Sequence, residues 1–86
     1  MVCASAEPGA AGASATAVRE RLGSPPQAAV LGPAPLFRLR GRERSQLVVK
    51  AGDRAAAVRA VGGAVAEVAA DRAHRRAQFS VDVDPQ

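Results

Sequence analysis

Apolar residues recur at a helical period in the second half of the chain. Four valines are spaced by three, four and three residues: Val58, Val61, Val65 and Val68. This spacing predicts a helix with one apolar face, and Asp53 is expected to cap its start. Gly62 and Gly63 fall in the middle of the helix, where glycine lowers helix stability and lets a neighbouring sheet approach closely.

Alternation of apolar and polar residues predicts strands before and after this helix. Residues 44–50 alternate except at Val48, and residues 77–83 alternate throughout. Each segment therefore has one apolar side, as expected of a half-buried strand. The apolar positions expected to face the valines of the helix are Leu47, Val49, Phe79 and Val81.

The start of the chain carries weaker signals. Ser14 is expected to cap a short helix near residues 14–22. A disordered, alanine-rich tail up to Ala13 fits the sequence equally well. We therefore expect residues 1–26 to be a partly flexible N-terminal segment and residues 27–86 to form the core of the domain.

Two further extended segments complete the order of elements. Residues 2–5 have a weak strand pattern, and residues 27–40 are extended but interrupted by Gly32-Pro33-Ala34-Pro35. The prolines exclude a central strand at that point, because proline cannot donate to the hydrogen-bond ladder. The resulting βαββαβ order predicts an α+β, ferredoxin-like sandwich, in which a four-stranded, mainly antiparallel sheet carries two helices on one face.

Positive charge is concentrated at one place in the chain. The net charge is +4, which favours a polyanionic partner such as nucleic acid, although a GC-rich genome also enriches arginine. Arginines occupy alternate positions between residues 38 and 44, so they would line one face of a continuous β-strand. If Gly41 makes a turn, they cluster instead at a hairpin tip. The candidate DNA-binding residues are Arg38, Arg40, Arg42, Arg44 and Lys50.

Either arrangement suits bidentate contacts with phosphate, and the alternative is a solvated, arginine-rich loop. Phe37 is the one aromatic residue beside these arginines, and we expect it to lie in the core or against another domain. With base stacking nearly absent, the patch is expected to read backbone charge and not sequence.

No catalytic residue, metal site or cofactor is predicted. Cys3 is the single cysteine and His74 the single histidine, so neither has a partner of its own kind. Asp82 and Asp84 share one face of the last strand without an evident third ligand, and a structural or interdomain salt bridge is expected there. No apolar run approaches the roughly 20 residues of a membrane span, and no secretory signal is present, so a cytoplasmic protein is expected.

Three segments in this order resemble the C-terminal domain of primosomal protein N′ (PriA), the bacterial replication-restart helicase family. They are residues 30–35 (VLGPAP), residues 39–50 (LRGRERSQLVVK) and residues 82–85 (DVDP), and the resemblance covers residues 28–86. It implies a C-terminal piece of a larger restart protein. It also implies that the piece binds single-stranded or branched DNA and docks single-strand-binding protein and other primosome components.

The family acts as an ATP-dependent 3′–5′ DNA helicase, but this chain is not expected to be an enzyme. Its only lysine, Lys50, follows a valine, so there is no glycine-rich phosphate loop ending in Gly-Lys-Ser or Gly-Lys-Thr. We therefore expect a DNA-binding and interaction module without the ATPase core. The alternative is a free-standing ferredoxin-like domain that is regulatory or binds RNA.

Overall fold

The computed structural model describes residues 1–23, 28–74 and 76–81. The βαββαβ order predicted from the sequence is confirmed, with a short 3-10 helix, η1, before the last strand. The elements are β1 (Val2–Ser5), α1 (Ala10–Leu22), β2 (Ala28–Leu39), β3 (Arg42–Ala51), α2 (Arg54–Ala70), η1 (Arg72–His74) and β4 (Gln78–Ser80).

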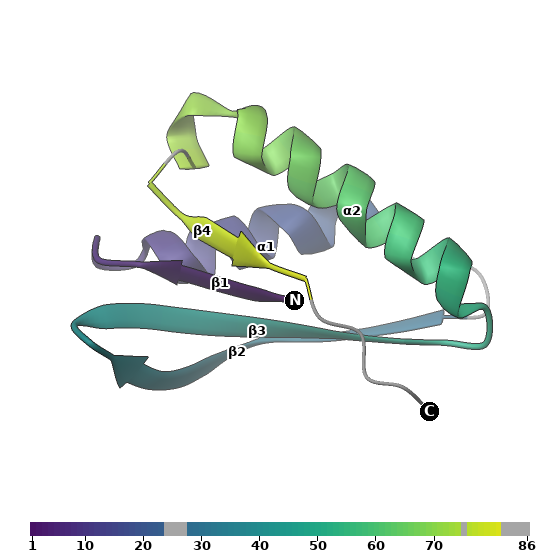
Figure 1. Cartoon of the computed structure of the whole chain (residues 1–86), viewed down its shortest axis with the longest axis horizontal. Coiled ribbons are helices and arrows are strands. Elements are labelled where there is room, and N and C mark those ends of the chain that lie inside the picture. Colours follow the sequence, from purple (N-terminus) through teal and green to yellow (C-terminus); the bar gives the residue numbers. More distant parts are fainter. Residues whose placement is uncertain (24–27, 75, 82–86) are drawn as a thin grey trace.

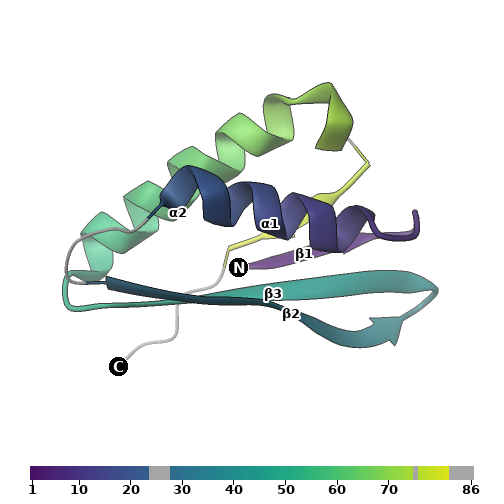
Figure 2. The same cartoon turned by 180° about the vertical axis from the view of Figure 1, so that it is seen from behind.

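The strands form one sheet in the order β2-β3-β1-β4, and every neighbouring pair is antiparallel. β1 therefore lies inside the sheet, and the proline-containing β2 lies at an edge, as its prolines require. Figures 1 and 2 show both helices on the same side of the sheet. This arrangement confirms the ferredoxin-like sandwich.

Helix α1 begins earlier than the sequence suggested. Its N-cap is Gly9, with φ of 79°, and not Ser14, which lies inside the helix and is fully buried. The hydroxyl of Ser14 forms a 2.9 Å hydrogen bond with Nδ1 of His74. Residues 10–13 form the first turn of this helix, so the alternative of a disordered, alanine-rich tail up to Ala13 is wrong.

The core lies between the helices and the side of the sheet that they cover. β1 contributes Cys3 and β3 contributes Leu47, both almost completely buried. The helices contribute mainly small side chains, including Val18 of α1 and Val68 of α2. We expected the core within residues 27–86. Residues of β1 and α1 also belong to it. The expected boundary between residues 26 and 27 lies outside the described residues.

Only part of the valine stripe of α2 is buried. Asp53 caps the helix as predicted, with Oδ1 accepting a 3.1 Å hydrogen bond from the Ala56 N–H. Val61 and Val68 are buried, but Val58 remains 39% exposed because α2 packs mainly on α1 and only slightly on β3. The expectation that Val58 faces the sheet is therefore wrong.

The mid-helix glycines do not admit the sheet either. A Cβ atom added at Gly62 or Gly63 would meet nothing within 4 Å. Val81, which was expected on the covered side of the sheet, is 45% exposed. β4 spans Gln78–Ser80, whereas the sequence predicted a strand over residues 77–83. Positions 82 and 83 of that prediction lie outside the described residues.

Candidate nucleic-acid interface

The arginines between residues 38 and 44 lie at the end of a β-hairpin. β2 and β3 are joined by Arg40 and Gly41, whose φ angles are 53° and 75°, and Leu39 pairs with Arg42. Two consecutive positive φ angles are typical of the tight turns whose twist matches a hairpin. The structure therefore shows the arginines at a hairpin tip, and the alternative of one continuous β-strand through residues 38–44 is wrong.

Two irregularities in β2 shape this hairpin. The register shifts between Leu31 and Ala34, and again between Leu36 and Leu39. At the first shift Gly32 has φ of 104°, and a Cβ atom there would lie 2.6 Å from the carbonyl oxygen of Gln46. β-bulges bend a strand, and Figures 1 and 2 show β2 curving away from the helices as it approaches the tip.

Two hydrogen bonds join helix α1 and its N-cap to the hairpin. A guanidinium nitrogen of Arg19 donates to the carbonyl oxygen of Gly32, at the first irregularity of β2. Nearer the tip, Oε2 of Glu43 accepts a 2.9 Å hydrogen bond from the Gly9 N–H, at the start of α1. The orientation of the hairpin is therefore set by the helix as well as by the sheet.

One of the arginines is neutralised within the hairpin. Arg38 donates to Oε1 of Glu43 over 3.0 Å, while Glu43 also accepts from Gly9. The hydrogen bond from the Gly9 N–H, together with that from Arg38, lowers the pKa of the Glu43 carboxyl. Glu43 is therefore a carboxylate at neutral pH, and it offsets the charge of Arg38.

No carboxylate among the described residues forms an ion pair with the remaining three arginines. Arg44 donates through Nε to the carbonyl oxygen of Phe37 over 3.0 Å, a contact that orders the side chain without neutralising it. In the part of the chain that the structure describes, Arg40 and Arg42 have neither an ion pair nor a hydrogen bond from their side chains. We call Arg40, Arg42 and Arg44 the tip patch. With four arginines and one glutamate, residues 38–44 carry a net charge of +3.

Lys50 does not belong to the tip patch. It is exposed on β3, opposite Ala29 and near the other end of the hairpin. Lys50 lies six positions along the strand from Arg44, which is about 20 Å at roughly 3.4 Å per residue. The five predicted contact residues therefore divide into the tip patch, the paired Arg38 and the distant Lys50.

Phe37 was expected either in the core or against another domain, and its exposure in this structure excludes only the core. Its side chain is 92% exposed, so within this fold it is not part of the core. It lies inside the second register shift of β2, between Leu36 and Leu39, and therefore has no cross-strand partner. Leu39, two residues later, is also 55% exposed. No pattern in the neighbouring sequence predicts the register shift at which Phe37 lies exposed.

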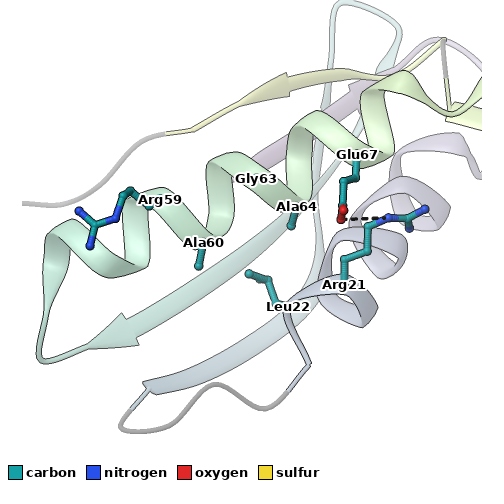
Figure 3. A pocket seen from close by; sticks show the side chains of 7 residues that line it. All are labelled: Arg21, Leu22, Arg59, Ala60, Gly63, Ala64 and Glu67. Atoms are coloured by element: carbon teal, nitrogen blue, oxygen red, sulfur yellow. Dashed lines mark ion pairs between the residues drawn. The ribbon is translucent and has the colours of Figure 1, made fainter.

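A shallow groove of about 340 Å³ lies between the two helices (Figure 3). Arg21 of α1 and Glu67 of α2 form an ion pair across it, with Nε and Oε2 3.7 Å apart. Small and apolar residues such as Leu22 and Ala64 make up most of its other walls, and Arg59 points away from the ion pair. The ion pair joins the two helices. The residues that line the groove include no serine or cysteine of the kind used as a nucleophile in covalent catalysis.

Other candidate chemistry is confined to buried or undescribed residues. Burial raises the pKa of the Cys3 thiol to about 11, which makes it a poor nucleophile at neutral pH. Among the described residues, no three His, Cys, Asp or Glu side chains gather as metal ligands would. Asp82 and Asp84, the carboxylates noted in the sequence, lie outside the described residues. No described helix has the length and hydropathy needed to cross a membrane.

Comparison with known proteins gives one clear result. Searches of curated proteins and of solved structures find no match. The family model described as Primosomal protein N C-terminal domain matches residues 1–86, which is the whole chain and more than the 28–86 over which the resemblance was drawn. No helicase domain is matched. Because the family model matches the whole chain and the fold has the expected ferredoxin-like topology, the chain belongs to the primosomal protein N C-terminal domain family.

Proposed function

We propose that this domain contacts the sugar–phosphate backbone of DNA through the tip patch, as part of a replication-restart primosome. The observation that carries the proposal is the concentration of Arg40, Arg42 and Arg44 around a two-residue turn, with uncompensated charge. Guanidinium groups bind phosphate oxygens in a bidentate manner, and such contacts position a protein on DNA without reading its sequence.

The other predicted residues have smaller roles in this proposal. Arg38 contributes less, because Glu43 already neutralises it. Lys50 could reach a phosphate only if the nucleic acid runs along the hairpin for about 20 Å. The domain is proposed to be a binding module of a cytoplasmic protein and not an enzyme, with single-strand-binding protein and other primosome components as its protein partners.

The test measures how DNA affinity depends on salt. With about three phosphate contacts to single-stranded DNA, log affinity should fall against log salt with a slope near −2.1. Raising the salt concentration from about 50 to 200 mM should then weaken binding roughly 20-fold. Fluorescence polarisation of a labelled oligothymidine, titrated with the 86-residue chain, measures both quantities.

A double variant and a charge-matched control complete the experiment. Arg40→Ala with Arg42→Ala removes two contacts, so the slope should fall to about −0.7. Arg59→Ala with Arg72→Ala removes the same charge from exposed positions on α2 and η1, and should leave the slope near −2.1. Equal binding by the tip variant and the parent at every salt concentration would overturn the proposal, as would an equal effect of the control. Tighter binding of the parent to an RNA of the same length would favour an RNA-binding domain instead.

A further inference from the structure

The tip patch adjoins an exposed aromatic ring. Phe37 is 92% exposed, whereas Phe79, the other aromatic residue, is half-buried and adjoins the core. A phenylalanine buries roughly 150–250 Å² when it packs, so leaving this ring in water forgoes a large stabilisation. An aromatic ring beside unpaired arginines is the combination with which proteins hold single-stranded nucleic acid.

We propose that Phe37 is a stacking platform for an unpaired base, whose neighbouring phosphates lie on the tip patch. This inference rests on the proposed function and adds to it a preference for single-stranded over double-stranded nucleic acid. In a duplex the faces of the bases are covered by their neighbours, and an exposed ring has nothing on which to stack. In a single strand every base offers a face, whatever the sequence.

The local structure ties the backbone of Phe37 to the tip patch. The carbonyl oxygen of Phe37 accepts the hydrogen bond from Nε of Arg44, so the backbone that carries the ring is tied to an arginine of the tip patch. The register shift leaves Phe37 without a cross-strand neighbour, and its 92% exposure means that no described residue covers its ring. The only carboxylate in the hairpin, Glu43, is engaged by Arg38 and Gly9, which reduces its repulsion of a polyanion.

The charge also favours nucleic acid over a protein groove as the occupant. Residues 38–44 carry a net charge of +3 around the ring. A protein pocket for Phe37 would need to compensate several guanidinium groups at its rim, whereas a single strand supplies a phosphate with every base. The ring and the charges are thus satisfied by one ligand.

The composition of the chain makes a direct test possible. The protein contains no tryptophan and no tyrosine, so Phe37→Trp introduces a single fluorophore at the proposed contact. At low salt an oligothymidine should quench this emission, and a blunt duplex of the same length should not. The matched control is Phe79→Trp, whose half-buried ring should not respond to the oligothymidine.

Affinity gives the second readout. Phe37→Ala should weaken binding of the oligothymidine roughly 5- to 150-fold, the range for loss of one base–aromatic stack. The salt slope should stay near −2.1, because no phosphate contact is removed. Duplex affinity should not change. Circular dichroism melting should be the same for Phe37→Ala and the parent, because the exposed side chain contributes little to the core.

The outcomes separate this inference from the proposed function. Saturable, salt-dependent binding of the oligothymidine without quenching of Phe37→Trp would overturn stacking and leave the phosphate contacts standing. An equal loss of single-strand and duplex affinity in Phe37→Ala would also overturn stacking, since the ring would then support the hairpin only. Absence of DNA binding by the parent at low salt would refute the proposed function and the stacking together.

Discussion

Replacing Leu47 by alanine tests the central packing arrangement of the fold. Leu47 is the largest of the fully buried side chains, with 1% of its surface exposed, and it lies on β3 beneath the helices. Leucine-to-alanine changes at such sites cost roughly 2.7–5 kcal/mol, through lost transfer free energy and the cavity left behind. Neighbouring core residues are mostly alanines and valines, which cannot extend to fill that cavity.

The expected cost is large beside the total stability. A chain of this length has an unfolding free energy of about 4–13 kcal/mol, so a loss of about 3 kcal/mol removes a substantial part of it. The melting temperature should fall by roughly 12–24 °C, at about 4–8 °C for each kcal/mol. Leu31→Ala is the matched control, because Leu31 is 48% exposed on β2 and faces the side of the sheet opposite the helices, beside Val48. It should cost about 1 kcal/mol or less.

Urea unfolding followed by far-ultraviolet circular dichroism is the suitable assay, because the chain lacks tryptophan and tyrosine. The midpoint should shift strongly for Leu47→Ala and slightly for Leu31→Ala, with similar slopes against urea. Equal costs for the two variants, or a cost below about 1 kcal/mol for Leu47→Ala, would refute the assignment of the covered side of the sheet.

Three further predictions concern single residues. Gly63→Ala should raise the free energy of unfolding by up to about 1 kcal/mol in the same urea assay, because a Cβ atom there meets nothing within 4 Å; a loss of stability would contradict an open helix face. Cys3, whose burial raises the pKa of its thiol to about 11, should react with a disulfide reagent at neutral pH only after unfolding in urea, and rapid reaction of the folded chain would contradict this. Glu43 has a lowered pKa, so its charged form contributes stability above the ordinary value of 4.5, and that contribution is lost as the pH falls through the lower folded-state value. Glu43→Gln should therefore be less stable than the parent at neutral pH, the difference should shrink in acid, and a constant difference would argue against the ionic contacts.

The sequence was sufficient for the order of the elements but not for the start of α1. The alternation around Leu47 and the helical spacing of the valines depend on periods that each element imposes locally. Ser14 has the chemistry of a helix cap, but it lies inside the helix, where its hydroxyl forms a hydrogen bond with His74, 60 positions away. No pattern within the segment reports a partner at that separation.

The candidate site was predictable to a similar degree. Gly41 indicated a possible turn, and from a turn the clustering of the arginines follows. The neutralisation of Arg38 by Glu43 and the exposure of Phe37 both depend on the register shift in β2, which no single residue near it signals. The distance of Lys50 from the tip patch follows directly from the position of the turn, because Lys50 lies at the other end of the hairpin.

The interior position of β1 has a consequence for folding during synthesis. Val2 pairs with Gln46 on one side and with Ser80 on the other, so the inner strand is made first and its last neighbour 78 positions later. At roughly 5–20 residues per second, a ribosome needs about 4–16 s to deliver that neighbour. Such long-range pairings slow folding, and until β4 arrives one edge of β1 presents unpaired backbone groups to any other extended chain. The nascent protein is therefore most open to intermolecular strand pairing after β3 has docked and before β4 is complete.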